Sequence, residues 1–235
     1  MDLRFLKSVA AQAASYAVAL RREIHSNPEL SDREEQTSAL VCRELERLNI
    51  PYTVLPGMHG VVGMISSGRE GPTVALRADM DALPIQEQTG QPYASTIDGM
   101  MHACGHDMHA AMLLGAAKLL KAREKELNGR VKLLFQPAEE CLEGAKDAIE
   151  KGVLEKPKPQ AAMMIHVMTG VPFPAGTAGG AKGVSAPAAD FFSISVQGKG
   201  CHGSMPQMGI DPITVASHII LALQEIHARE LSMSD

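Results

Sequence analysis

The sequence predicts an α/β fold in which a mixed, mostly parallel sheet is flanked by helices. Two observations support this prediction. Short apolar runs bounded by Gly and Ser alternate with longer segments in which apolar residues recur every three or four positions. Such alternation of strands and helices is typical of a layered sheet. With 235 residues, 45% of them hydrophobic, the chain can bury the core of such a domain.

The pattern places the helices and strands along the chain. Ser31 is a candidate N-cap of the second helix, with Glu34 positioned three residues later for a capping box. Helices are expected at about 6–25, 32–48, 109–124 and 144–151, and strands at 61–65, 73–76, 131–135 and 162–165.

Around residue 187 the pattern changes, and a smaller α+β domain is expected to begin there. Residues 1–186 would then form the first domain, and residues 187–235 only the start of the second. A single strand at 191–196 and a single helix at about 212–229 are too little to fold independently. We therefore expect the chain to be truncated at its C-terminal end.

Composition argues against several classes of partner. The net charge of -5 and the pI near 6.0 offer no basic surface to phosphate backbones. Aromatic residues make up 3% of the chain, without Trp, and no apolar run approaches the length of a membrane span. The four cysteines are scattered, which argues against a disulfide framework. We expect small-molecule chemistry in the cytoplasm, without nucleic acid or membrane.

A dense cluster of potential metal ligands occupies residues 101–109, which read MHACGHDMH. Thiolate sulfur and imidazole nitrogen are preferred ligands of zinc and similar ions. Cys104 and His106 are therefore candidate ligands, and the glycine between them permits a tight bend. Asp107 and His109 could orient these ligands. The alternative is an ordinary helix N-terminus with surface histidines.

Three further candidates follow apolar strands. Glu139 and Glu140 come after the strand at 131–135, and His166 follows the strand at 162–165. Ligands of open α/β sheets bind at the carboxyl ends of the strands. Adjacent carboxylates repel unless a cation or proton lies between them, so one glutamate as ligand and one as general base is an economical assignment. Alone, each feature has an ordinary structural alternative, but together with the Cys/His loop they indicate a site for one or two metal ions.

Two aspartates lie at a further strand end. Asp79 and Asp81 belong to the segment RADMDALP at residues 77–84, directly after the strand at 73–76. Either carboxylate could orient a metal-bound histidine or a base. The alternative is a turn that uses aspartate side chains to hydrogen-bond its own backbone.

In these segments the chain resembles the di-metal peptidase and aminoacylase family, and within it the branch of hippurate hydrolases, auxin-conjugate hydrolases and N-acetyldiaminopimelate deacetylases. The resemblance implies a zinc-peptidase-like catalytic domain joined to a lid domain, with homodimers in the full-length form. The similarity covers nearly the whole chain, in order: Arg22 and His25 with Pro28-Glu29-Leu30, RADMDALP at 77–84, MHACGHDMH at 101–109, QPAEE at 136–140, His166-Val167, and GKGCHGSMP at 198–206 with Asp211-Pro212-Ile213.

The resemblance also implies a reaction. Glu139 would be the general base that takes a proton from a water bridging the two ions, and this water would attack the amide carbon of an N-acyl amino acid or small peptide. Asp79 would correspond to the family's aspartate beside the metals, and His202 to a lid histidine that reaches the substrate across a dimer. The two divalent ions, of Zn, Mn, Co or Ni, would be held by Cys104, His106, Glu140 and His166.

Some positions depart from the family pattern. Arg77 stands where other branches have a metal-binding His, Cys141 where this branch usually has Gly, and Gln207 where His is common. Family members also continue beyond this length, with the rest of the lid and one more metal-binding His.

Several functions therefore stay open. The favoured one is an N-acyl amino acid amidohydrolase in its full-length form, and a dipeptidase or carboxypeptidase is an alternative. The chain itself could be an inactive truncated fragment or a metal-binding module of such an enzyme. A purely structural metal site is disfavoured, because such sites are closed by four tight ligands and would leave Glu139 spare.

Overall fold

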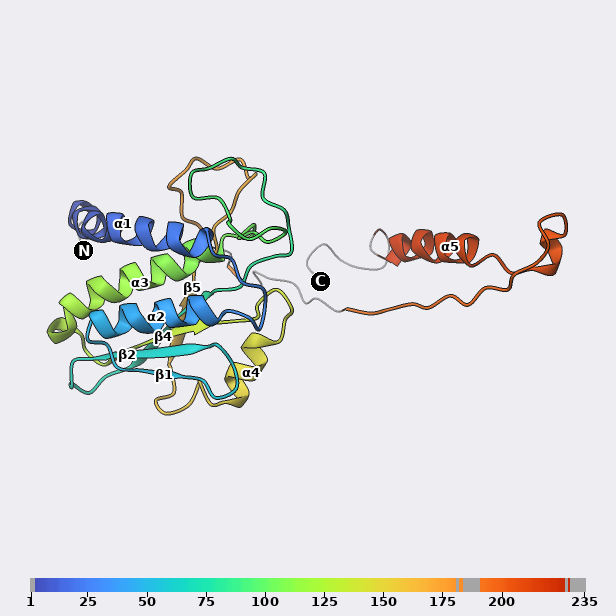
Figure 1. Ribbon diagram of the computed structural model, residues 1–235. Helices are drawn as coiled ribbons and strands as arrows, with labels where there is room; N and C mark the ends of the chain where they lie inside the picture. Colours follow the sequence, from blue (N-terminus) through green and yellow to red (C-terminus); the bar gives the residue numbers. More distant parts are fainter. Residues whose placement is uncertain (1–2, 181, 184–190, 227, 229–235) are drawn as a thin grey trace. The chain divides into compact units, whose positions relative to one another are not determined.

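The chain falls into two compact units, Met1–Gly170 and Val171–Asp235 (Figure 1). The structure, a computed structural model, describes residues 3–180, 182–183, 191–226 and 228. The domain boundary expected between residues 186 and 187 lies outside the described residues, so it stays a prediction.

The first unit is built on a five-stranded sheet with the order β1-β2-β4-β3-β5. Strand β2 runs antiparallel to its neighbours β1 and β4, whereas β3 pairs in parallel with both β4 and β5. Four strands therefore share one direction, which confirms the mixed, mostly parallel sheet that the sequence predicts. The strands are β1 (Tyr52–Val54), β2 (Val61–Ser66), β3 (Thr73–Asp79), β4 (Arg130–Gln136) and β5 (Ala161–Met164).

Helices cover both faces of this sheet (Figure 1). On central strand β4, Leu133 and Phe135 belong to the large core that includes α1, α2 and α3, whereas Leu134 packs with Ala148 of α4 in a second cluster. Successive side chains of a strand point to opposite faces, so the two clusters lie on opposite sides of the sheet. The helices are α1 (Leu3–His25), α2 (Glu35–Arg47), α3 (His106–Ala122) and α4 (Gly144–Glu150).

The connections bring the functional residues to one edge. The chain passes from β3 through α3 to β4, and then from β4 through α4 to β5 on the far side of β3. The direction of travel across the sheet therefore reverses at the β3–β4 pair. In open α/β sheets, ligand sites lie outside the carboxyl ends of the strands at such a reversal.

The helices and strands expected in this unit are confirmed, with small shifts of their ends, but the capping of α2 was predicted wrongly. Helix α2 begins at Glu35, which is too far from Ser31 for that side chain to serve as its N-cap. The Glu29 carboxylate accepts the first free N–H groups instead, from Gln36 at 2.9 Å and Thr37 at 2.8 Å. Ser31 is thereby free to donate to the candidate site, as described below.

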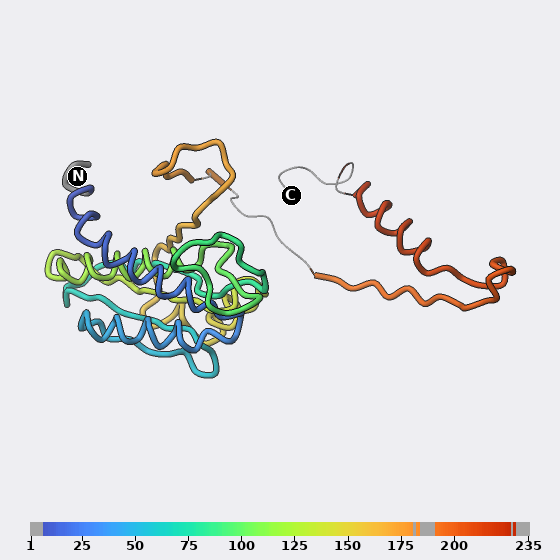
Figure 2. The backbone as a smooth tube through the Cα atoms, turned by 45° about the horizontal axis from the view of Figure 1, so that its top comes forward, coloured from blue at the N-terminus to red at the C-terminus, as the bar shows by residue number. Residues whose placement is uncertain are grey.

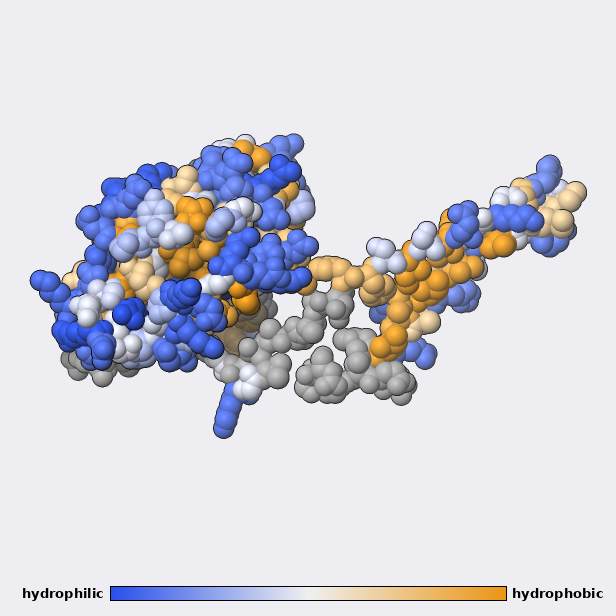
Figure 3. Space-filling view, turned by 90° about the horizontal axis from the view of Figure 1, so that it is seen from below, coloured by the Kyte–Doolittle hydropathy of each residue, from blue (hydrophilic) through white to orange (hydrophobic). Residues whose placement is uncertain are grey.

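In the described part of the second unit lies the helix α5 (Pro212–Glu225), whose N-cap Asp211 accepts the N–H of Ile213 at 2.9 Å. The strand expected at 191–196 is wrong, because in the described part of this unit no neighbouring strand pairs with these residues. Apolar surface gathers over this unit (Figure 3). Its exposed side chains include Phe191, Phe192, Ile194, Ile213, Ile220 and Leu221.

None of the helices in the described residues is long and apolar enough to cross a membrane.

The connection from α4 to β5 is anchored by a buried lysine. Lys132 on β4 donates to the backbone carbonyls of Val153, Glu155 and Pro157, at 2.6, 3.0 and 2.9 Å. Burial lowers the pKa of this amine, whereas the nearby Glu155 carboxylate raises it. Three carbonyls from one loop thus take the place of water around a buried cation.

Replacing this lysine should destabilise the first unit. We expect Lys132→Met to lower the free energy of unfolding by about 2 to 4 kcal/mol, because the carbonyls lose their donor in a buried setting. Urea unfolding measures the change, with the exposed Lys146→Met as the control, expected to lie within about 0.5 kcal/mol of wild type. Equal stability of the two variants would contradict the anchoring role.

Candidate metal centre

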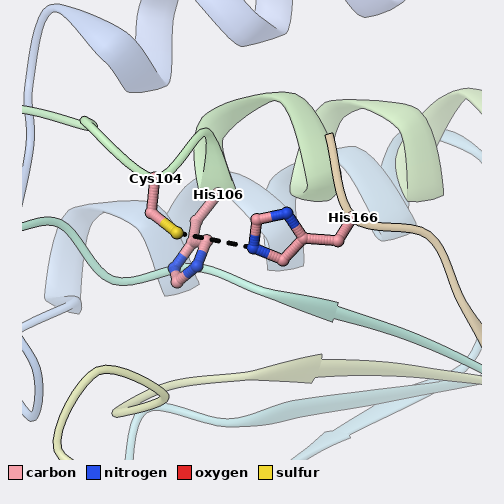
Figure 4. A group of neighbouring side chains, drawn as sticks. All are labelled: Cys104, His106 and His166. Carbon is pink, nitrogen blue, oxygen red and sulfur yellow. Dashed lines mark hydrogen bonds between the residues drawn. The ribbon is translucent and has the colours of Figure 1, made fainter. Parts of the chain in front are cut away.

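The candidate residues predicted in the first unit converge at the carboxyl ends of β3, β4 and β5. Figure 4 shows the side chains of Cys104, His106 and His166 pointing toward one another, and Cys104 Sγ lies 3.4 Å from His166 Nε2. Each of the three offers a ligand atom within 4.8 Å of the others. His106, Glu139 and Glu140 form a second group that meets the same criterion. His106 belongs to both groups, so the two lie side by side.

His106 is the centre of this arrangement. The ring is fully buried, and Nδ1 lies 3.0 Å from Asp81 Oδ1. With Nδ1 donating its proton to Asp81, Nε2 carries the lone pair. Among the described residues Nε2 has no hydrogen-bond partner, although Asp79 Oδ1 and Glu140 Oε1 lie at 3.8 Å and Glu139 Oε2 at 3.9 Å. A buried lone pair faced by three carboxylates leaves space and charge for a cation.

The electrostatics of His106 support the same conclusion. Burial lowers its pKa, but the hydrogen bond to Asp81 and the surrounding carboxylates outweigh burial and raise the pKa above its ordinary value. The site therefore favours positive charge at this ring. A proton or a metal ion at Nε2 supplies that charge.

Asp81 holds the centre together. Oδ2 accepts the backbone N–H of Glu140 at 2.9 Å and the hydroxyl of Ser31 at 2.7 Å, while Oδ1 faces His106. Burial raises the pKa of Asp81, but these hydrogen bonds lower it by more, so the net shift of the pKa is downward. The carboxylate is thus held ionised and fixed, and it aligns a candidate ligand from α3 with another from the loop after β4.

Asp79 lies fully buried beside it at the end of β3. Its Oδ1 is 2.5 Å from Nδ1 of His109, and its Oδ2 is 3.1 Å from Nη1 of Arg77. Burial raises its pKa, but the hydrogen bond with His109 and the charges of His106 and Arg77 lower it to about 2. Arg77 therefore helps to neutralise this carboxylate.

Glu139 differs from the two aspartates because none of the described residues donates a hydrogen bond to its carboxylate. Its side chain is 34% exposed. Burial, together with the charges of Asp79 and Glu140, raises its pKa, although His106 lowers it. A carboxylate whose pKa is raised toward neutrality is suited to accept and return a proton.

The loop that carries the glutamates is fixed by Glu34, a role that the sequence did not indicate. Glu34 is fully buried, and its Oε1 accepts the backbone N–H of Ala138 at 2.8 Å. Ala138 has a φ of +54°, a conformation that costs energy for a residue with a side chain. The sequence pattern assigned Glu34 to a helix cap and gave no sign of this contact with a distant loop.

Cys104 requires a cation to ionise. Burial and the neighbouring Glu140 carboxylate raise its pKa to about 12, so the free side chain is a thiol at neutral pH. A metal ion binds the thiolate and releases the proton.

A buried ion-pair network supports the first turn of α3. Helices α1 and α3 lie side by side in both views (Figures 1 and 2). Across this contact Asp107 Oδ2 lies 2.7 Å from both Arg21 Nε and His25 Nδ1, and His25 Nε2 is 3.2 Å from Glu87 Oε1. Asp107 was expected to orient the ligands, whereas Glu87 was not identified from the sequence.

His202 lies in the second unit. It is exposed, and its Nδ1 is 2.8 Å from the Ser204 hydroxyl. The role expected for it at the substrate stays a prediction.

The network around His25 predicts a pH-dependent contribution to stability. The hydrogen bond to Asp107 raises the pKa of His25 above 6.5, although burial opposes this shift. The folded protein therefore holds this proton more tightly than the unfolded chain. The resulting stabilisation is complete below about pH 6.5 and is lost as the pH rises through the folded pKa.

We expect the difference in unfolding free energy between wild type and His25→Gln to shrink as the pH rises from 6 to 9. Urea unfolding of both proteins with a chelator present measures it. Arg123→Gln, which removes one partner of an exposed pair with Glu126, is the control and should have little effect on stability and no such pH dependence. A difference between wild type and His25→Gln that is constant with pH contradicts the assignment.

Comparison with known proteins agrees with the geometry. An IAA-amino acid hydrolase of Arabidopsis thaliana, ILR1-like 2, is 46% identical over 233 residues, which are 99% of this chain and 52% of that protein. Thermostable carboxypeptidase 2 of Saccharolobus solfataricus is 43% identical over 235 residues, which cover 98% of this chain and 59% of that protein. The chain thus spans little more than half the length of the curated relatives it matches.

A solved structure is also similar. The YxeP protein of Bacillus subtilis, a dinuclear metal-binding peptidase of the M20 family, is 46% identical, with a TM-score of 0.58 over 63% of this chain and 40% of that one. The model of peptidase family M20/M25/M40 matches residues 75–229, which include the candidate site. The chain therefore belongs to peptidase family M20/M25/M40.

Proposed function

We propose that this protein is a metal-dependent amidohydrolase that cleaves the amide bond of N-acyl amino acids. The observation that carries the proposal is the buried, unpartnered Nε2 of His106, which faces three carboxylates beside the Cys104–His166 pair. Glu140 Oε1 is also buried without a hydrogen-bond partner among the described residues. Such atoms are costly to bury unless a ligand completes them.

The donor set fits two divalent ions. Sulfur, imidazole nitrogen and carboxylate oxygen together suit Zn, Mn, Co or Ni. When bound, the ions would polarise the amide carbonyl and lower the pKa of water. The similarity to a dinuclear M20 peptidase supports a pair of ions rather than one. The residues that would hold them are Cys104, His106, Glu140 and His166.

The remaining groups divide the proton chemistry among themselves. Glu139 accepts a proton from the attacking water and delivers it to the leaving nitrogen, because its pKa is raised and no described residue donates a hydrogen bond to it. Asp81 and Asp79 stay ionised and hold His106 and His109 in fixed tautomers. This division separates the mobile proton from the groups that set the geometry.

The relatives support two substrate classes. An IAA-amino acid hydrolase favours N-acyl amino acids, and a carboxypeptidase of nearly equal identity makes small peptides the second candidate. Both are small molecules with an amide bond. The homodimer and the cytoplasmic location expected from the sequence stay predictions, as does the role of His202.

Hydrolysis of a substrate panel tests the function. The purified protein is assayed with N-acetyl, N-benzoyl and N-arylacetyl amino acids and with dipeptides, before chelation, after chelation and after metal is restored. We expect chelator-sensitive release of the free amino acid, fastest with N-acyl amino acids. Faster turnover of dipeptides would favour the peptidase alternative. Hydrolysis that survives removal of all metal, or a protein that neither binds metal nor turns over any substrate, would contradict the proposal.

The role of Glu139 as general base should be separable from metal binding. We expect Glu139→Gln to lower kcat by about 10²- to 10⁴-fold, because the amide cannot accept the proton. Metal content, measured by elemental analysis, should stay at the wild-type value. Glu143→Gln, an exposed neighbour at the start of α4, is the control and should retain wild-type kcat. A Glu139→Gln protein with full activity would refute the base assignment.

A further inference from the structure

His109 lies among the candidate ligands, but both of its ring nitrogens are already engaged. The side chain is buried one turn after His106 on α3. Its Nδ1 is 2.5 Å from Asp79 Oδ1, and its Nε2 is 2.9 Å from the backbone nitrogen of Val167. The ring packs 5.3 Å from the His106 ring and 4.5 Å from the His166 ring, centroid to centroid.

These contacts determine the tautomer of His109. The N–H of Val167 can only donate, so Nε2 must accept and the ring proton must be on Nδ1. Asp79 accepts that proton, and Arg77 holds the carboxylate from its other oxygen. His109 is therefore a neutral ring with no lone pair left for an ion. Although His109 forms a potential ligand group with Asp79 and His106, its contacts exclude it from coordination.

Val167 links this ring to His166. Its N–H donates to His109, while its carbonyl accepts from Nδ1 of His166 at 2.7 Å. This second hydrogen bond leaves the lone pair of His166 on Nε2, the atom that lies 3.4 Å from Cys104 Sγ. The orientation of His166 thus depends on the position of the Val167 backbone.

The side chain of Val167 packs against Gly105. A Cβ atom built on Gly105 would overlap Cγ2 of Val167, so any side chain at this position would force the Val167 side chain to shift. The residue also has a φ of +89°, which favours glycine. The glycine between Cys104 and His106 therefore accommodates the Val167 side chain, while His109 binds its backbone.

We propose that His109 is a positioning residue for the metal centre, which holds Val167 so that His166 Nε2 is directed toward Cys104. The proposal rests on the proposed function, in that Cys104 and His166 are taken as metal ligands. The ladder of β5 with β3 ends at Met164, and Ile165 and His166 beyond it are exposed, so the contact of Val167 with His109 is a main restraint on this segment. Without an acceptor at His109, the Val167 N–H would lose its partner and His166 its fixed direction.

Two amide substitutions separate the two contacts of the ring. The side-chain oxygen of His109→Gln can reach the position of Nε2 and accept from Val167, but this variant lacks the donor to Asp79. His109→Asn can place an NH₂ donor near the position of Nδ1, within reach of Asp79, but its side chain is too short to meet Val167. The two variants are therefore matched: His109→Gln keeps the hydrogen bond with Val167, and His109→Asn keeps the one with Asp79.

The affinity of the metal-free protein for Zn²⁺ is measured by competition with a chromophoric chelator. We expect His109→Asn to bind Zn²⁺ about 10- to 100-fold more weakly than wild type, the range typical for loss of a group that orients a ligand. His109→Gln should bind within a few-fold of wild type. The free energy of unfolding of each metal-free variant is measured in parallel by urea titration.

A purely structural role gives a different result. Each variant loses one buried hydrogen bond, so both should lose similar stability, and under a structural role both would lose affinity equally. Equal affinities of the two variants, whether both unchanged or both weakened, would overturn the positioning role. A wild-type protein that binds no Zn²⁺ would instead overturn the proposed function and this inference with it, so the two failures are distinguishable.

Discussion

The candidate site depends on one buried carboxylate, that of Asp81. It meets the imidazole of His106 from α3, the backbone of Glu140 from the loop after β4, and the hydroxyl of Ser31 from the segment before α2. These three segments are far apart in the sequence, and a single charge that needs several donors draws them together. Because Asp81 takes the proton on Nδ1, the free nitrogen of His106 must face the other carboxylates. The orientation of the whole centre follows from this hydrogen bond.

Charge balance then separates the roles of the neighbouring acidic groups. Asp79 has a hydrogen bond with His109 and an ion pair with Arg77, so its pKa falls to about 2, whereas Glu139 has no such partner among the described residues and its pKa rises. The Cys104 thiol, close to Glu140, has its pKa raised in the same way. A divalent cation would relieve these repulsions at once, which is why the cluster is more readily explained as a metal centre than as a structural network.

The first turn of α3 contacts several elements, because helical spacing directs its side chains to different sides. His106 and His109 are three residues apart, so they share a face of α3 that meets β3 and the candidate site, whereas Asp107 points to α1. One turn of helix thus joins the proposed ligands to the α1 network and to the end of β5. This arrangement explains how so few residues can fix ligands that come from separate parts of the chain.

Much of this could be predicted from the sequence, because periodicity and strand ends are local properties. Alternating apolar runs predicted the α/β sheet. Glu139, Glu140 and His166 could be placed at one edge because they follow predicted strands, and Cys104 and His106 were joined to them as a dense Cys/His loop. The contacts of Glu34, Glu87, Asp81 and His109 could not be assigned, since their hydrogen bonds join residues that are distant in sequence. Ser31 shows the difference: its local pattern indicated a helix cap, whereas the fold uses it to bind Asp81. The sequence thus determined which groups are present, and only the tertiary structure decided which of them donate, accept or remain free, because hydrogen bonds between distant segments depend on their positions in space.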